Sequence, residues 1–150
     1  MMTKSVAMTW VSNLNYLGVT GWRLPITVPG ADPINDKFLN INSEMGHLYY
    51  TKLGNKPGYS GFRNAGPFIN LYAAKNGDLH QISSTPAPVN YGSNYIWVFN
   101  WFTGEQNIKP SSFSIGYAWP VHDGDIGAQL GLKKISRASN IPAIFLLLND

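Results

Sequence analysis

Glu44 and His47 stand three residues apart in the stretch SEMGHLYY, residues 43–50. On a helix, this spacing puts both side chains on one face, and a Glu-x-x-His pair can supply two ligands of a di-iron site. Such a site needs a second pair and further carboxylates, and the sequence contains neither a second ExxH nor an HExxH motif. A metal-dependent hydrolase that uses Glu44, His47 and His122 is therefore the weakest functional hypothesis.

The same stretch also has the features of a helix start. Asn42 or Ser43 can serve as the N-cap, and Glu44 then lies in the first turn, where the helix dipole favours an anion. Gly46 permits close packing, and Glu44 can pair with Arg23 of the stretch WRLP. We favour this structural interpretation.

A second acidic group occurs in HDGD, residues 122–125. Asp123 and Asp125 could begin a calcium site, but calcium takes 6–8 oxygen ligands. If the loops converge, the shell could be completed by Asp32, Asp36, Asn40 or Asn42. An Asp-Gly turn is the simpler interpretation.

Aromatic residues suggest a third kind of site, because sugars are bound by exposed aromatic faces backed by polar groups. The candidate ligand-binding residues are Trp101, Glu105, Asn107 and Trp119. Strand alternation, however, places Tyr95, Trp97, Phe99 and Trp101 on one side, which is the side expected to face a core.

The charge distribution excludes a basic nucleic-acid-binding face. The formal net charge is +3, yet residues 1–127 hold 8 Lys and Arg against 7 Asp and Glu. The excess lies in Lys133, Lys134 and Arg137, which are either solvated tail residues or contacts for a polyanionic polysaccharide.

With 150 residues the chain fits one domain. It has no cysteine, which excludes disulfides and thiolate chemistry. Its first residues lack a signal-peptide pattern. The run IPAIFLLL, residues 141–148, is too short for a transmembrane helix.

Periodicity predicts the elements that position these residues. Apolar spacing from Val6 to Leu17 predicts a helix capped by Thr3, with Trp10 facing inward and Gly18 and Gly21 ending it. A loop over 27–42 and a helix over about 43–53 follow. Short strands are predicted at 67–72 and 79–84, and a clear strand in YIWVFNWF turns at 103–105 to pair with SIGYAWPV, residues 114–121.

Five segments in order carry a family resemblance: MTWVSNLNYLGVTGWRLP, NSEMGHLYYTKLG, GPFINL, WVFNWFTGEQN and GYAWPVHDGD. Over residues 8–126 the chain resembles the Lcl C-terminal-domain-like family of bacterial proteins, a domain of largely unknown function found in secreted proteins, including some with PEP-CTERM sorting tails. Trp22, Arg23, Glu44 and His47 belong to its most specific motifs. Asp32, Asp36 and Asn40 lie in a loop where relatives often carry a cysteine pair. Gln81 lies near a position at which relatives often carry a tryptophan.

The resemblance implies a C-type-lectin-like α+β fold, with two helices packed on a small twisted antiparallel sheet beneath long loops. It also implies an extracellular or cell-surface location, and the namesake domain belongs to an adhesin that binds sulfated glycosaminoglycans. The related formylglycine-generating activity relies on cysteines that this chain lacks.

We therefore expect a domain over 1–127 and a basic, then apolar, tail over 128–150. The leading hypothesis is a non-catalytic surface module that recognises glycans or sulfated polysaccharides, without an obligatory cofactor. The alternative is a subunit of an assembly in which the apolar run docks on a neighbour.

Overall fold

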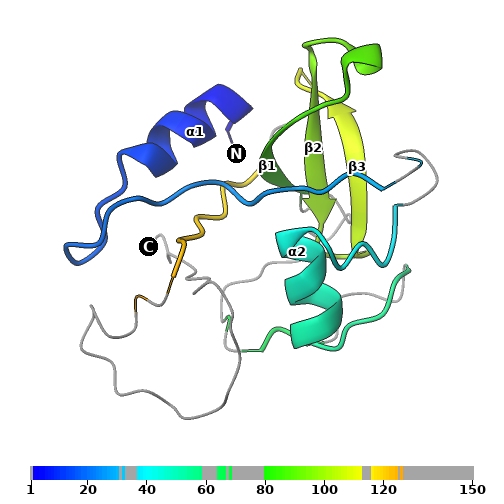
Figure 1. Ribbon diagram of the computed structural model, residues 1–150, viewed down its shortest axis with the longest axis horizontal. Helices are drawn as coiled ribbons and strands as arrows, with labels where there is room; N and C mark the ends of the chain where they lie inside the picture. The colour runs from blue at the N-terminus through cyan, green and yellow to red at the C-terminus, as the bar shows by residue number, and fades with distance from the viewer. Residues whose placement is uncertain are drawn as a thin grey trace.

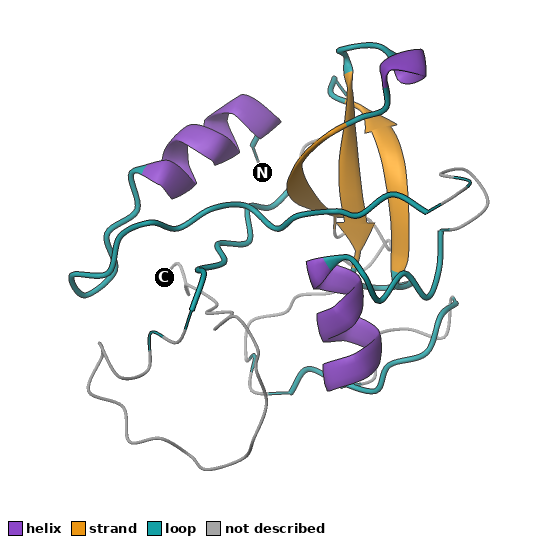
Figure 2. Ribbon diagram, in the orientation of Figure 1, coloured by secondary structure: helices purple, strands orange, loops and turns teal. Residues whose placement is uncertain are grey.

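The computed structural model describes residues 2–30, 32, 37–58, 64–66, 68, 80–112, 116–124 and 126. Two helical segments accompany a three-stranded antiparallel sheet of order β1-β2-β3 (Figures 1 and 2). The first helix is α1 (Lys4–Ser12); the second begins as α2 (Glu44–Gly46) and widens into a π-helix (His47–Lys52). The strands are β1 (His80–Pro86), β2 (Tyr95–Asn100) and β3 (Glu105–Pro110), and a 3₁₀ turn (Val89–Tyr91) precedes β2. The expected α+β class is confirmed.

Helix α1 starts where the sequence predicts and ends early. The Oγ1 of Thr3 accepts a hydrogen bond from the Val6 N–H at 3.4 Å, which satisfies one of the free donors of the first turn. The helix ends at Ser12, before the two glycines expected to end it. Its buried residues are Ala7 and Val11, while Trp10 is only half-buried, so the predicted inward placement of Trp10 is only partly right.

The partner of β2 differs from the predicted one. A turn at residues 101–104, in which Gly104 has a φ of 79°, leads directly into β3. The register runs from Asn100 opposite Glu105 to Tyr95 opposite Pro110. The prediction that residues 114–121 form this partner is wrong, because the tight turn brings the next six residues into register first. Residues 116, 117 and 121 instead make isolated bridges to residues 2, 81 and 23.

The strand predicted at 79–84 is confirmed as β1, which pairs with β2 and contains an irregularity between Ile82 and Pro86. The strand predicted at 67–72 lies outside the described residues except for Phe68. The tail predicted over 128–150 lies wholly outside them, so that boundary stays a prediction.

Both faces of β2 are buried, which the sequence did not indicate. Ile96 and Val98 join a cluster with Ala7 and Val11 of α1. Phe99 and the following Trp101 join a second cluster beside the helix of residues 44–52. Because successive strand residues point to opposite faces, the two clusters lie on opposite sides of the sheet. One helix contributes to each cluster. The sheet is therefore the middle layer of the fold.

Candidate functional site

Arg23 is the centre of the charged cluster in the described part of the chain. Its Nη2 lies 2.7 Å from the Glu44 Oε1 and its Nη1 lies 2.8 Å from the Oε2, so the pair is bidentate. Its Nε also donates to both carboxylate oxygens of Asp123, at 3.2 and 3.3 Å. The suggested pairing of Glu44 with Arg23 is confirmed, and Asp123 adds a third chain segment. This arrangement connects residues 23, 44 and 123, and we call it the arginine clamp.

The electrostatics of the arginine clamp follow from these contacts. Hydrogen bonding to Glu44 raises the pKa of Arg23 against the opposing effect of burial. Hydrogen bonding from Arg23 lowers the pKa of Asp123. The Asp123 side chain is 77% exposed and that of Glu44 only 21%, so the Glu44 half of the clamp is the better shielded from solvent.

Glu44 is also tied to the backbone of the loop that contains Arg23. Its Oε2 accepts a hydrogen bond from the Ile26 N–H at 2.7 Å, and its own N–H donates to the Ile26 carbonyl at 3.2 Å. Both oxygens of the Glu44 carboxylate therefore accept hydrogen bonds from within the protein. They support the interpretation of Glu44 as a tether.

Ser43 occupies the N-cap position, but its hydroxyl does not cap the helix. It accepts from the Val28 N–H at 2.8 Å and donates to the Val28 carbonyl at 3.1 Å. The predicted capping role of its side chain is therefore wrong, because the loop at Val28 offers both a donor and an acceptor. Gly46 packs as expected: a Cβ there would overlap the Asn40 carbonyl.

The histidines and carboxylates do not form a metal centre within the described residues. No group of three His, Cys, Asp or Glu side chains converges there. The His122 Nε2 lies 3.0 Å from the Thr20 carbonyl, and its ring packs edge-on against Trp22. His47 is half-buried in the second helical segment. These positions give no support to the metal-dependent hydrolase hypothesis.

The predicted calcium ligands are placed differently from what the sequence suggested. Both Asp123 oxygens face the positively charged guanidinium of Arg23, which opposes a cation at this position. The other predicted ligand, Asp125, lies outside the described residues. Asp123 is therefore half of an ion pair with Arg23, and the calcium site with Asp125 stays a prediction.

Trp101 and Trp119 do not form an exposed platform. Their rings stack with centroids 4.8 Å apart, and their exposed fractions are only 1% and 2%. The prediction that they bind a ligand at the surface is therefore wrong: the second core cluster needs their apolar area. Trp22, a residue of the family motif, is also buried, and its Nε1 donates to the Val19 carbonyl at 2.9 Å.

The polar partners predicted with these tryptophans do come together on β3. Asn107 donates from its Nδ2 to the Glu105 Oε1 at 3.0 Å, and the Lys37 Nζ lies 3.5 Å from the same oxygen. The carboxylate therefore already has an amide donor and a cation. This group is a link between β3 and the loop at residue 37.

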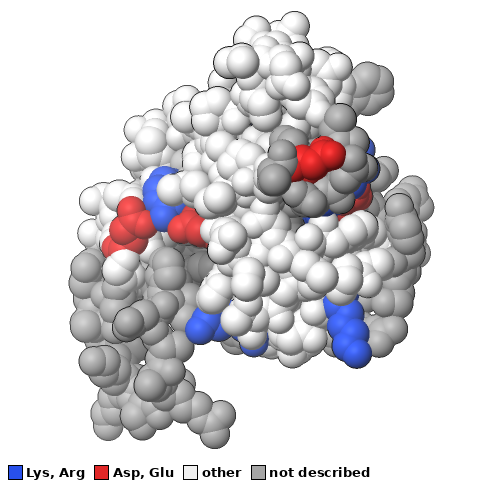
Figure 3. Space-filling view, turned by 45° about the vertical axis from the view of Figure 1, so that its right-hand side comes forward, with Lys and Arg blue, Asp and Glu red and all other residues white. Residues whose placement is uncertain are grey.

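The surface that sequence reasoning missed is apolar. Five large hydrophobic side chains are 37–59% exposed on two segments, 26–28 and 38–41. The segments are joined by hydrogen bonds from the Asn40 Nδ2 and the Ser43 hydroxyl to the Val28 carbonyl. On the face drawn in Figure 3, acidic and basic side chains are few and are separated by areas of uncharged residues. We call these five side chains the hydrophobic loop surface: Ile26, Val28, Phe38, Leu39 and Ile41.

The backbone beneath the hydrophobic loop surface is already hydrogen-bonded. The N–H and carbonyl groups of Ile26 are both paired with Glu44, and those of Val28 with Ser43. Gln106 of β3 also donates to the Val28 carbonyl at 3.3 Å. The surface therefore offers apolar side chains on a fixed backbone. The signal in the sequence was the presence of aliphatic residues in a segment rich in Pro, Asp and Asn.

Leu39 adopts a conformation that is unfavourable for its type. Its φ is 58°, in the left-handed region, which costs a non-glycine residue about 1–2 kcal/mol. Its side chain is nevertheless 59% exposed, so burial does not repay that cost within this chain.

Comparison with protein-family models, with curated proteins and with solved structures finds no match for this chain. Among the described residues, no helix combines the length and the apolar character needed to span a bilayer.

Proposed function

We propose that this protein is a non-catalytic binding module that joins a second copy of itself through the hydrophobic loop surface. The observation that carries the proposal is the display of five exposed apolar side chains on a hydrogen-bonded backbone. Contiguous apolar surfaces on otherwise polar proteins commonly mark interaction sites. The proposal takes up the alternative that the sequence offered, a subunit of an assembly, and moves the contact from the apolar tail to the loops.

The chemistry of the surface favours an apolar partner over a glycan. A sugar needs hydrogen-bonding groups near an aromatic face, and here the backbone groups of Ile26 and Val28 are taken by Glu44 and Ser43. A partner is therefore recognised by contacts with apolar side chains, of which four are aliphatic and one, Phe38, is aromatic.

A second copy of this chain meets that requirement. An isologous two-fold contact brings the same patch from both subunits together, so the patch must be complementary to itself. None of its five side chains is charged, and the contact therefore brings no like charges together. The strain at Leu39 is also accounted for, since its side chain becomes buried on association.

The setting proposed for this module comes from the family resemblance. Two helices, a small antiparallel sheet and long loops support a C-type-lectin-like arrangement. We propose with it a location at the cell surface or outside the cell, where two identical domains associate as a closed pair.

Sedimentation equilibrium of wild type and of the double variant Leu39→Asn/Ile41→Asn tests this function. Asparagine tolerates the left-handed conformation, so the change removes apolar area without added strain at position 39. The wild-type mass should rise toward twice 16.6 kDa with concentration. In the variant, the dissociation constant should increase roughly 100-fold, as expected for two apolar side chains left exposed.

Val89→Asn is the matched control, because Val89 is 98% exposed and is not one of the five side chains of this surface. It should leave the dissociation constant unchanged. A wild type that stays monomeric at every concentration contradicts the proposal. If that monomer is retained on heparin, polysaccharide recognition replaces it.

A further inference from the structure

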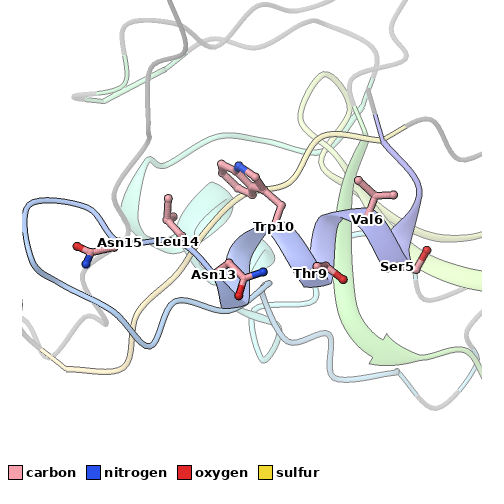
Figure 4. Close-up of a pocket in the computed structure, with 7 residues that line it drawn as sticks. All are labelled: Ser5, Val6, Thr9, Trp10, Asn13, Leu14 and Asn15. Carbon is pink, nitrogen blue, oxygen red and sulfur yellow. The ribbon is translucent and has the colours of Figure 1, made fainter.

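Helix α1 carries a second apolar feature on its outer side. A shallow groove of ≈ 540 Å³ runs along the helix and into the residues that follow it (Figure 4). Its apolar part comes from Val6, Trp10 and Leu14, and none of its lining residues is charged. The full lining is Ser5, Val6, Thr9, Trp10, Asn13, Leu14 and Asn15.

The groove is backed by the first core cluster. Trp10 and Leu14 are half-buried and pack against that cluster from the outside, whereas Val6 is 54% exposed. The groove is therefore a fixed surface on a helix whose inner face is already buried. An occupant would cover apolar area that the described residues leave open to solvent.

The chain itself passes close to this helix before its apolar run. Ile126 is fully buried in the same cluster as Ala7 and Val11 of α1. Residues 127–140 follow, and then the uncharged run IPAIFLLL at 141–148. Fourteen residues reach at most about 46–50 Å, while a nine-residue helix is only about 13 Å long. The run can therefore reach any part of the groove.

We propose that residues 141–148 dock in the α1 groove of their own chain. The groove and the run are both uncharged, and their contact covers apolar surface on each. Attachment through Ile126 makes the encounter intramolecular, which favours the same chain over a second copy in dilute solution. This docking is independent of the hydrophobic loop surface.

Photocrosslinking at the groove tests the docking directly. Val6 is replaced by p-benzoylphenylalanine, and chains of natural isotope content are mixed with chains labelled with heavy nitrogen before irradiation. After trypsin cleavage, the expected product joins position 6 to residues 138–150 within one isotope class. The same photoreactive residue at Met8 is the control, since Met8 is 46% exposed on α1 but does not line the groove. It should give little of this product.

Hydrogen exchange of the full chain provides a second readout if the photoreactive variant folds poorly. In wild type, amides of residues 141–148 should be protected. Val6→Asp should speed their exchange by roughly tenfold or more, whereas Met8→Asp should not. Three results overturn the proposal: crosslinks between isotope classes, an unprotected run in wild type, or equal effects of the two aspartates.

Discussion

At the scale of single residues, Arg23 is the side chain that holds three separate segments of the chain together. The planar guanidinium matches a carboxylate with two parallel hydrogen bonds, which a lysine cannot do. It makes that match with Glu44 and also binds Asp123, 100 residues away in sequence. The Glu44 contact could be predicted because both residues belong to adjoining motifs. The Asp123 contact could not, because an Asp-Gly turn indicates nothing about its distant partner.

Glu44→Gln should destabilise the protein by about 1.5–3 kcal/mol, as expected for losing charge-assisted hydrogen bonds in a shielded position. The glutamine keeps the size of the side chain but leaves the guanidinium without its main countercharge. Urea unfolding followed by circular dichroism gives the free energy. Asp123→Asn is the comparison, and its cost should stay below about 1 kcal/mol because Asp123 is largely exposed. Equal costs for the two variants would contradict this ranking.

The Asp123 contact also has a defined pH dependence. Arg23 lowers the pKa of the folded carboxyl, so the unfolded state binds more protons as the solution becomes acidic. The stabilisation that this contact adds to the folded protein is therefore complete above the unfolded pKa of about 3.9. It disappears as pH falls through the lower folded pKa. The difference in free energy of unfolding between wild type and Asp123→Asn, measured by urea unfolding at each pH, should shrink over that acidic range.

At the scale of elements, the second helix shows where local preference and packing disagree. Gly46 lies inside the helix, where alanine would normally be better by about 1 kcal/mol. The Asn40 carbonyl, however, occupies the space that a Cβ would need. Close approach of the preceding loop to the helix therefore explains the glycine.

Gly46→Ala should lower the free energy of unfolding by about 1–3 kcal/mol, the usual cost of overpacking, despite the gain in helix propensity. Chemical denaturation measures the change. Thr51→Ala, at an exposed position of the same helix, should change stability by less than about 0.5 kcal/mol. If alanine at position 46 stabilises the protein, the loop does not hold the position described.

The strands show the limit of pattern reasoning at this scale. β2 was predictable because its residues, apart from Asn100, are aromatic or β-branched. β3 has the polar sequence EQNIKP, which lacks a strand pattern and pairs because the turn at Gly104 places it beside β2. Chain geometry, and not side-chain preference, selects this strand. The more hydrophobic segment 114–121 was the better candidate by composition alone.

At the scale of the whole molecule, β2 joins the two core clusters. Ile96 and Val98 lie on one face with α1, and Phe99 lies on the other with the second helix. The sequence indicated one aromatic, core-facing side and a mixed second side. It could not show that α1 would cover the second side, since no local pattern sets the distance between an N-terminal helix and a strand 90 residues later.

This shared strand predicts that both halves unfold together. Ile96→Ala, in the cluster with α1, should cost about 2–5 kcal/mol, because a buried isoleucine leaves a cavity. The variant should shift the far-ultraviolet circular dichroism and the tryptophan fluorescence by the same denaturant concentration, since tryptophans lie in both clusters: Trp22 with Ile96, and Trp101 and Trp119 in the other. Val89→Ala, at a fully exposed position, should move neither curve by more than about 0.5 kcal/mol. Separate transitions for the two probes would show that each cluster folds by itself, and β2 would then not be the element that makes the molecule one cooperative unit.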